Sequence, residues 1–593
     1  PKRPASWDGI RNASENGVCS QLDLLTQTVI GDEDCLYLNV YVPCSIHGTM
    51  RNPVMIWIHG GMYLIGSCTD VRPDYLLAKE VIVVSINYRL GAFGKTYSFK
   101  SVDGFLDPKP PASWDGIRNA SENGNVCSQL DLSTETVIGD EDCLYLNVYV
   151  PRSIYGTTRI PVMVWIHGGG YLIGSGSDIN RRPDYLLAKE VIVVFINYRL
   201  GVFGFLKLGH ETANGNQGLK DQIAALKWVR ENIQVFGGDL ENITIFGNSA
   251  GAASTHLLML SPLSKGLFHK AILQSGISTC IWAIKETQQE MISFKLASLL
   301  GNDSKDPEEI VEFLRTIPAD EIVKAQHQCQ FLTPMDVYGM NLQFIPVIDN
   351  EVKRPLFAHP IHQLLNDDND IPIIVGCTSH EYSIFFLDDS SEKTLKMLYE
   401  DLPHHVRKVG NLQDPVKIAQ LTERAKQWYF NGKPCTENSV PSIIQCMSDI
   451  YMNIPTTEFV NSRRKKKEAV TYFYKFSYIG DQTTTKQMMV GHKLRMTGAA
   501  HEDELSYLFY IPTYKVNDPQ PPAIGTKDRK VLEALTNMWT NFAKTGNPTP
   551  AIDQNVTTTW LPATADVLNY LEINDALQCA KITDYTNIFQ ESD

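Results

Sequence analysis

Residues Phe246–Ala252 read FGNSAGA, a Gly-x-Ser-x-Gly pattern with Ser249 at its centre. The apolar, β-branched run Ile243–Ile245 precedes the pattern, and the helix-like stretch Ala253–Leu260 follows it. This order predicts a sharp strand-to-helix turn, the nucleophile elbow. Small residues beside the serine allow the strand and the helix to approach closely. The turn therefore presents the serine hydroxyl at the end of the strand, near the positive end of the helix dipole.

Short apolar strands alternate with helical stretches on both sides of this turn. Upstream, Val191–Ile196 suits a buried parallel strand, and Asn214–Gly238 has apolar residues at helical spacing. Downstream come two further strand-like stretches, Lys270–Gly276 and Ile371–Gly376, separated by polar helical sequence suited to a lid or cap. The alternation predicts an α/β fold with a large, mostly parallel central sheet and helices on both faces.

Composition narrows the range of partners. The 593-residue chain has a formal net charge of -14, which argues against a nucleic-acid or anionic-membrane partner. The basic run Arg463–Lys467 precedes a strand-like stretch and is interpreted as the solvated end of a helix. No apolar run approaches the roughly 20 residues that a membrane helix needs, so we expect no membrane span.

A long internal duplication precedes the elbow. Residues 5–94 recur almost verbatim as residues 112–204, and ASWDGIRNASENG begins both at Ala5 and at Ala112. Two copies that nothing continues do not make a solenoid. Neither copy contains the elbow, and only the second copy runs on into the rest of the chain without interruption.

We therefore predict two parts: residues 1–94, a surplus partial copy that is loosely docked or partly folded, and residues 95–593, the main domain. The copies compete for one place in the sheet, so strand exchange between molecules, and a misfolded or inactive chain, are alternatives. The second copy should win because it joins the following helix directly, with an advantage in loop closure of about a kcal/mol. Deleting residues 1–94 is expected to leave activity and stability unchanged or improved.

The copies differ in a glycine run. The second copy reads WIHGGG and ends at Gly170, whereas the first reads WIHGGM and ends at Met62. Glycines after a buried strand let backbone N–H groups turn toward a substrate oxygen. Methionine in the third position would obstruct that approach, so the second copy is predicted to form the functional loop.

An activated serine also needs a base and an orienting acid. Two loops after Ser249 offer them: TSHEY contains Glu381, and TGAAHEDEL contains His501. Each residue alone is more typical of a surface position. Their order around an elbow and a glycine run instead indicates nucleophilic catalysis, which needs no metal and no cofactor.

These motifs occur in the order found in a known family. The chain resembles the carboxylesterase/cholinesterase family (type-B carboxylesterases), most closely insect α-esterase-like carboxylesterases, over roughly residues 95–590. The resemblance is carried by EDCLYLNVY from Glu141, HGGG from His167, NYR from Asn197, NQGLKDQ from Asn216, FGNSAG from Phe246, GAAH from Gly498 and MWTNFA from Met538.

The resemblance implies an α/β-hydrolase fold and a serine carboxylic-ester hydrolase that forms an acyl-enzyme on a small-molecule ester. It assigns roles to six residues: Ser249 as nucleophile, His501 as base, Glu381 as acid, and Gly169, Gly170 and Ala250 as oxyanion N–H donors. Xenobiotic and dietary esters are the first candidates, and juvenile-hormone-type or pheromone esters are the narrower alternative. Asn248 argues mildly against that alternative, because juvenile hormone esterases commonly have glutamine there.

The resemblance also implies a disulfide between Cys127 and Cys143, with Cys19 and Cys35 as its counterpart in the spare copy. Cys280 matches half of a second bridge whose partner is absent, and should be free.

Sequons stand at Asn12, Asn119, Asn242, Asn302 and Asn555. These features favour a secreted or endoplasmic-reticulum protein over a cytoplasmic one. Because the chain starts at Pro1 without a methionine, we expect a truncated or processed amino terminus.

Two departures from the family pattern bear on function. The loop between Cys127 and Cys143 lacks the tryptophan with which cholinesterases hold a choline cation, so acetylcholine is not the expected substrate. Tyr382 stands where glycine usually follows the acid, which predicts a slightly altered loop.

A non-catalytic adhesion protein of the neuroligin type is the alternative from another class, although such relatives typically lose a triad residue. The oligomeric state stays open.

Overall fold

The computed structural model describes residues 18, 21–22, 29–30, 38–43, 53–59, 67–69, 73–87, 105–109, 120, 122–151, 159–211, 213–286, 289–330, 340–365, 370–386, 392–466, 468–483, 498–515, 520–583 and 587–589. The cysteines of the spare copy, Cys19 and Cys35, lie outside these residues, as does Met62. Contacts divide the chain into two compact units. Unit 1 comprises residues 1–96 and 114–123, and unit 2 comprises residues 97–113 and 124–593.

Unit 2 is organised around a nine-stranded sheet with the strand order β18-β17-β16-β15-β14-β13-β9-β10-β8. The strands are β8 (Leu146–Tyr149), β9 (Ile160–Ile166), β10 (Ile192–Ile196), β13 (Gly238–Asn248), β14 (Lys270–Gln274), β15 (Ile373–Thr378), β16 (Thr471–Phe476), β17 (Leu568–Ile573) and β18 (Leu577–Ile582). All strands between the two edges pair in parallel, whereas β8 and β18 pair antiparallel to their neighbours. The predicted α/β fold with a mostly parallel sheet is confirmed.

Helices follow most of these strands. They are α2 (Asp184–Leu187), α3 (Gly201–Phe205), α4 (Gln217–Asn232), α5 (Ala250–Leu260), α6 (Gln289–Leu300), α7 (Pro307–Arg315), α8 (Ala319–Gln330), α10 (Ile361–Leu364), α11 (Glu392–Glu400), α12 (Leu402–Val409), α13 (Pro415–Phe430), α14 (Val440–Ser448), α15 (Ile454–Lys466), α17 (Leu505–Leu508) and α18 (Lys527–Thr545). Between β14 and β15 lie α6, α7, α8 and α10, which are the helical region predicted there. None of the helices in the described part of the chain has the length and apolar character needed to cross a membrane.

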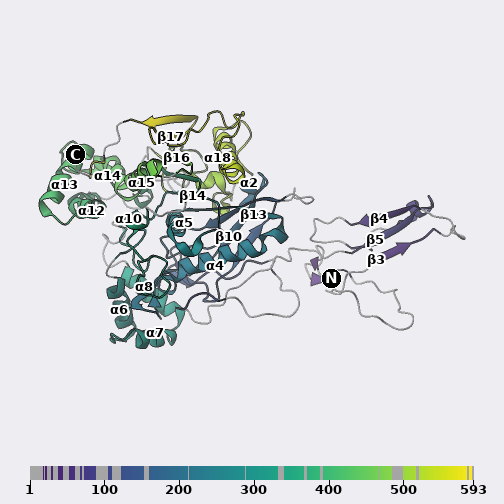
Figure 1. Ribbon diagram of the computed structural model, residues 1–593, viewed down its shortest axis with the longest axis horizontal. Helices are drawn as coiled ribbons and strands as arrows, with labels where there is room; N and C mark the ends of the chain where they lie inside the picture. The colour runs from purple at the N-terminus through teal and green to yellow at the C-terminus, as the bar shows by residue number, and fades with distance from the viewer. Residues whose placement is uncertain are drawn as a thin grey trace. The chain divides into compact units, whose positions relative to one another are not determined.

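Strand β9 shows how the core is divided into two layers. Its alternate side chains point to opposite faces of the sheet. Val162 and Val164 pack in one cluster with residues of α4 and α5, while Met163 and Trp165 pack in another with residues of α18. Figure 1 labels these three helices beside the strands of the sheet. All four side chains are buried. A strand covered on both faces has the continuous apolar sequence that marked it as central.

The register of the sheet aligns the carboxyl ends of four neighbouring strands. Gly247 pairs with Ile166 of β9, and Asn248 pairs with Gln274 of β14, which in turn pairs with Gly376 of β15. The elbow and the loops after β9, β14 and β15 therefore begin at one edge of the sheet. That edge is where open α/β sheets bind ligands.

The basic run ends α15 as interpreted, with Lys465 and Lys466 exposed, but its two arginines are not solvated as expected. Arg463 is buried, and its guanidinium donates to the carbonyl of Ile371 at 2.7 Å. Arg464 donates to the carbonyls of Thr564 and Ala565. These two side chains hold neighbouring loops, because an arginine can satisfy several carbonyl groups at once.

Unit 1 contains a small sheet with the strand order β3-β5-β4, formed by β3 (Leu38–Tyr41), β5 (Ile82–Ile86) and β4 (Val54–Ile58). This order and its register repeat those of β8, β10 and β9 in unit 2. Every residue of β4 is exposed, whereas β9 is buried from Val162 onward. The same local sequence thus forms the same strands in both units, and only β9 has the neighbour β13 and the covering helices.

One sequence difference falls on a core position of unit 2. Phe195 of β10 is buried, with its ring centroid 5.7 Å from Phe509 and 5.2 Å from Tyr149. Its counterpart in the first copy is Ser85, whose hydroxyl donates to the carbonyl of Cys68 at 2.8 Å. Exchanging the copies would leave a cavity where Phe195 packs. This difference supports the prediction that the second copy belongs to the main domain.

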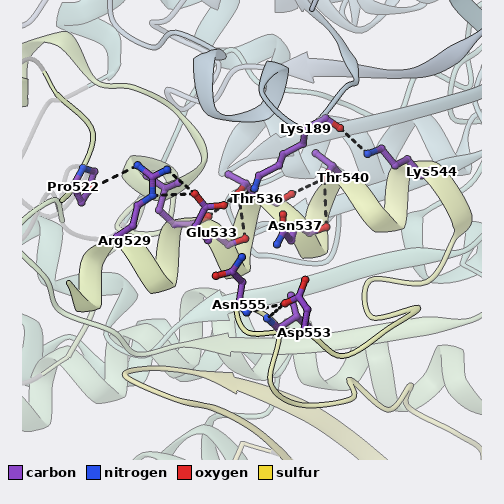
Figure 2. A network of polar contacts seen from close by, with 12 residues as sticks. Lys189, Pro522, Arg529, Glu533, Thr536, Asn537, Thr540, Lys544, Asp553 and Asn555 are labelled. Carbon is purple, nitrogen blue, oxygen red and sulfur yellow. Dashed lines mark hydrogen bonds and ion pairs between the residues drawn. The ribbon is translucent and has the colours of Figure 1, made fainter. Parts of the chain in front are cut away.

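Ion pairs also tie the second copy to the carboxyl-terminal helix α18. Lys189, which follows α2, lies 2.5 Å from the carboxylate of Glu533, and Lys544 donates to the Lys189 carbonyl at 2.6 Å (Figure 2). Arg529 holds the other oxygen of Glu533 from the same helix. The counterpart in the first copy, Lys79, is exposed. Contacts distant in sequence therefore distinguish two nearly identical segments.

We expect Phe195→Ser to lower the free energy of unfolding of unit 2 by about 3 kcal/mol or more, because a large buried aromatic side chain is lost. The measurement is the thermal unfolding midpoint of the full chain, together with the temperature at which its enzymatic activity is lost. The matched control is the reciprocal change Ser85→Phe, which should leave both temperatures of unit 2 unchanged. Equal losses from the two variants would contradict the assignment of the second copy to the main sheet.

Candidate active site

The turn at Ser249 has the strained geometry of an elbow. Ser249 has φ 57° and ψ -126°, a conformation that residues with a side chain seldom adopt, and its N–H donates to the Gln274 carbonyl at 2.9 Å. Helix α5 starts at the next residue. A Cβ atom on Gly251 would lie 2.0 Å from the carbonyl oxygen of Ile166, so only glycine fits there. This approach of α5 to β9 explains the small residues of the motif.

The predicted acid and base meet in the structure. Glu381 opens the 3-10 turn η3 (Glu381–Phe386) after β15, and its Oε2 lies 2.5 Å from Nδ1 of His501. The other oxygen, Oε1, accepts from the hydroxyl of Ser275 at 2.5 Å and from the N–H of Thr378 at 2.6 Å. Glu381 is 2% exposed. Its carboxylate is thus fully hydrogen-bonded and aimed at the imidazole.

The loop that carries His501 is fixed to the acid loop. The N–H of His380 donates to the carbonyl of Ala499, whose own N–H donates to the hydroxyl of Ser379, both at 2.9 Å. His380 therefore packs against this loop and does not line the cavity of Ser249. Burial by itself would lower the pKa of His501, but the Glu381 carboxylate outweighs burial and raises that pKa. A carboxylate at this position stabilises the imidazolium that forms when a neutral imidazole accepts a proton.

The glycine run after β9 forms an open loop beside the serine. Gly169 has φ 103° and Gly170 has φ 62°, which are conformations that favour glycine. A Cβ atom on Gly169 would also lie 2.2 Å from the carbonyl oxygen of Ile173. Within the described residues, the N–H groups of Gly169, Gly170 and Ala250 have no acceptor. They are available to an oxyanion, and the N-terminus of α5 adds its dipole.

Two side chains that the sequence reasoning missed brace this loop. Gln129 accepts from the N–H of Gly174 at 2.7 Å and donates to the carbonyl of the same residue at 2.9 Å. The ring of Tyr198 stacks on His167, with centroids 4.4 Å apart, and its hydroxyl donates to the His167 carbonyl. Burial lowers the pKa of His167 to about 4, so this histidine is neutral. Nothing in the spacing of Gln129 in the sequence pointed to this contact.

Ser249, Glu381 and His501 line one cavity of about 420 Å³ together with Gly169 and Gly170. The remaining wall is mostly apolar and is contributed by Leu130, Leu132, Leu172, Ile173, Trp282, Val323, Met340, Leu342, Tyr382, Ile384, Phe385, Tyr451 and Met452, with the polar residues Gln326, His327, Ser448 and Glu502. The Ser249 hydroxyl forms no hydrogen bond to any described residue, so it is open to a ligand in this cavity.

Two of the departures noted in the sequence shape this wall. The loop between Cys127 and Cys143, which lacks the tryptophan of cholinesterases, contributes Leu130 and Leu132 to the wall. Tyr382, the residue after the acid, is buried and stacks on Tyr451 with centroids 5.7 Å apart. A glycine at this position would leave that space empty. Both departures therefore make the cavity more apolar.

Other predictions concern the frame of the site. Cys127 and Cys143 form a disulfide, and Cys280 is buried with a free thiol, as expected. Arg199 and Asp221 form a buried bidentate ion pair, with nitrogen–oxygen distances of 2.7 and 2.8 Å. Pairing and hydrogen bonding offset the cost of burying both charges. This pair lies outside the cavity and supports the start of α4.

Comparison with known proteins decides the family. A model of the carboxylesterase family matches residues 1–101 and 103–589, which is nearly the whole chain. The chain belongs to the carboxylesterase family. It is a carboxylic ester hydrolase, and its similarity to esterases favours the enzyme over the non-catalytic adhesion protein. The two matched stretches meet between the two copies of the duplicated segment.

The relatives of this carboxylesterase include insect esterases. Esterase FE4 of Myzus persicae is 33% identical over 491 residues, which cover 79% of this chain and 82% of the relative. Juvenile hormone esterase of Tribolium castaneum is 34% identical over 468 residues, covering 75% and 77%. The crystal structure of juvenile hormone esterase from Manduca sexta, with OTFP covalently attached, matches with a TM-score of 0.70 at 30% identity, covering 82% of this chain and 92% of that one. The fold is the α/β-hydrolase fold.

We expect Ser275→Ala to lower kcat of this carboxylesterase by roughly tenfold, because hydrogen bonds to charged groups contribute about 1.5–3 kcal/mol. The loss of the hydroxyl that holds Oε1 of Glu381 should misalign the carboxylate. The measurement is kcat for a p-nitrophenyl ester. Ser383→Ala is the matched control. The Ser383 hydroxyl is buried in the turn that carries Glu381, but it donates to the His380 carbonyl and not to the Glu381 carboxylate. A control as slow as the variant would contradict the orienting role of Ser275.

Proposed function

We propose that the enzyme hydrolyses neutral, apolar carboxylic esters through an acyl-enzyme on Ser249, with His501 as base and Glu381 as acid. The contact that carries this proposal is the 2.5 Å separation of Glu381 Oε2 and His501 Nδ1 in the cavity that also holds Ser249. An acid that holds Nδ1 leaves Nε2 of the imidazole to act on the serine.

In the proposed reaction, Nε2 of His501 takes the Ser249 proton as the serine oxygen attacks the ester carbonyl. The carbonyl oxygen becomes an oxyanion, which the N–H groups of Gly169, Gly170 and Ala250 stabilise. One such donor contributes about 3 kcal/mol to the transition state. His501 then returns the proton to the leaving alcohol, and water, activated by the same base, releases the acid and restores Ser249.

The wall of the cavity supports an apolar substrate. Leu130 and Leu132 replace any aromatic cation site in that loop, and Tyr382 and Phe385 add further apolar surface. An ester with a medium-length acyl chain or an apolar alcohol would bury most of its surface there. Xenobiotic and dietary esters fit this description, as does the juvenile-hormone-type ester suggested by the names of two relatives.

A secreted or lumenal location accompanies this proposal. The disulfide between Cys127 and Cys143 is typical of an oxidising compartment. Of the sequons, Asn242 is unsuited to glycosylation, because its amide accepts from Lys270 and donates to the Lys544 carbonyl. The sequons at Asn302 and Asn555 lie in loops of the described chain.

We expect a fluorophosphonate probe to label the folded protein at Ser249, because the probe reacts with activated serines through the same attack. The measurement is mass spectrometry of the labelled peptide. Ser249→Ala should remove the label, and heat-denatured wild type should not react. A label that persists in Ser249→Ala, or no label in active folded protein, would contradict Ser249 as nucleophile.

For p-nitrophenyl esters, kcat/KM should rise with acyl length by up to about fourfold per methylene, since each buried methylene contributes about 0.8 kcal/mol. The rise should end when the chain fills the cavity. Acetylthiocholine should react more slowly than the neutral esters, because the loop between Cys127 and Cys143 contributes Leu130 and Leu132, and no tryptophan, to the wall. Juvenile hormone is tested in the same panel. A strong preference for it would indicate a juvenile-hormone-type esterase, and similar rates across the esters would indicate a broad specificity. A preference for acetylthiocholine would overturn the apolar assignment.

A further inference from the structure

A second carboxyl group lies fully buried behind the elbow. Glu504 follows His501 by three residues and has no exposed surface. Its Oε1 accepts from the amide of Gln274 at 3.0 Å and from the amide of Asn248 at 3.4 Å. It does not line the cavity of Ser249. The proposed reaction assigns it no step, although its burial would cost several kcal/mol as a charged group.

The two residues that hold Glu504 stand directly before two functional serines. Asn248 ends β13 and precedes Ser249, and Gln274 ends β14 and precedes Ser275. The Gln274 carbonyl also accepts from the N–H of Ser249 at 2.9 Å, and its side-chain oxygen accepts from the indole of Trp539 at 3.2 Å. Glu504 therefore links the ends of two neighbouring strands, beneath the nucleophile and beneath the donor to the acid.

The surroundings of Glu504 favour its neutral form. Among the described residues it pairs with no lysine or arginine, and the groups that face it are Glu381, His501, Cys377 of β15 and Tyr474 of β16. Burial, followed by the Glu381 carboxylate, raises the pKa of Glu504 to about 7.

Hydrogen bonding points the same way. Two buried oxygens of this cluster, Oε2 of Glu504 and Oδ1 of Asn248, have no partner among the described residues. Both belong to side chains that already touch through Oε1 of Glu504 and the Asn248 amide. A proton on the carboxyl group supplies the donor that this pair of oxygens lacks.

We propose that Glu504 is a positioning residue that works in its protonated, neutral form, holding Asn248 and Gln274 in place while Glu381 remains the carboxylate bonded to His501. The inference rests on the proposed function of the triad. Ionisation of Glu504 would add a further negative charge to those of Glu381 and Glu502 near His501 and stabilise its imidazolium. It would also leave a buried charge without a counter-ion.

Glu504→Gln tests this proposal, because glutamine has nearly the shape and the donor of the protonated acid. We expect kcat near neutral pH to stay within about twofold of wild type. The acid limb of the kcat/KM profile should move to lower pH by several tenths of a unit, since glutamine cannot add a negative charge to those of Glu381 and Glu502 near His501. Glu504→Leu, which has neither donor nor acceptor, should lower kcat by roughly tenfold with KM little changed.

A thermal unfolding series gives a readout that needs no activity. Because the folded-state pKa of Glu504 lies above its unfolded value, the native state binds more protons between the two. Wild-type stability from this group is therefore full below the unfolded pKa near 4.5 and is lost as pH rises through about 7. Glu504→Gln should remove that loss, so the difference in unfolding temperature between pH 5 and pH 8 should shrink.

Glu533→Gln is the matched control. Burial would raise the pKa of Glu533, but Lys189 and Arg529 outweigh burial and lower it. The ionised Glu533 stabilises the fold above its unfolded pKa. Glu533→Gln should therefore lower stability near neutral pH, whereas Glu504→Gln should raise it.

Two outcomes would overturn the assignment of Glu504 as a neutral acid. One is a kcat of Glu504→Gln as low as that of Glu504→Leu. The other is that no Glu504 variant changes kcat, the acid limb of the kcat/KM profile or the unfolding temperature. If wild type hydrolyses no ester, the proposed function fails, while the unfolding series still tests the charge state of Glu504.

Discussion

The close approach of α5 to the end of β9 is the constraint on which the site depends. With Gly251 against the carbonyl of Ile166, the chain must reverse within one residue, and Ser249 takes up the strained conformation that the reversal requires. The same approach brings the glycine loop after β9 next to the serine. One steric condition therefore sets both the position of Ser249, the proposed nucleophile, and that of the glycine loop, whose N–H groups are the proposed oxyanion donors. The parallel register then places the loops after β14 and β15 at the same edge.

The duplication separates what local sequence does from what context does. The first copy forms β3, β5 and β4 with the order and register of β8, β10 and β9, yet its strand β4 is exposed along its whole length. The sequences of β13 and α18 occur only once in the chain. Only one copy of the duplicated segment can therefore pair with β13 and pack against α18. Phe195 in place of Ser85, together with the pairing of Lys189 with Glu533, makes the second copy the one that fits. Near identity in sequence thus leads to opposite degrees of burial.

Charge in the site is arranged around one imidazole. Glu381 is held by Ser275 and Thr378, which leaves its other oxygen for His501. The cavity wall itself is largely apolar, and this low polarity strengthens each charge interaction within it. Behind the elbow, Glu504 accepts from Asn248 and Gln274 and so ties the ends of two neighbouring strands together. Ester hydrolysis, the activity shared by the carboxylesterase family, requires this combination of one paired base, free N–H donors and a dry wall.

Sequence patterns alone predict the alternation of strands and helices, the elbow at Ser249, the glycine run and the order in which Glu381 and His501 follow. Those features are local, because periodicity, turn chemistry and small residues leave marks within a few positions. The tertiary structure decided the contacts of Ser275, Gln129 and Glu504, and the burial of Arg463 against the interpretation of a solvated helix end. Their partners stand far away in the chain, so nothing in the neighbouring sequence specifies them. It also decided the difference between the copies, because burial depends on strands and helices that each copy shares with the whole sheet.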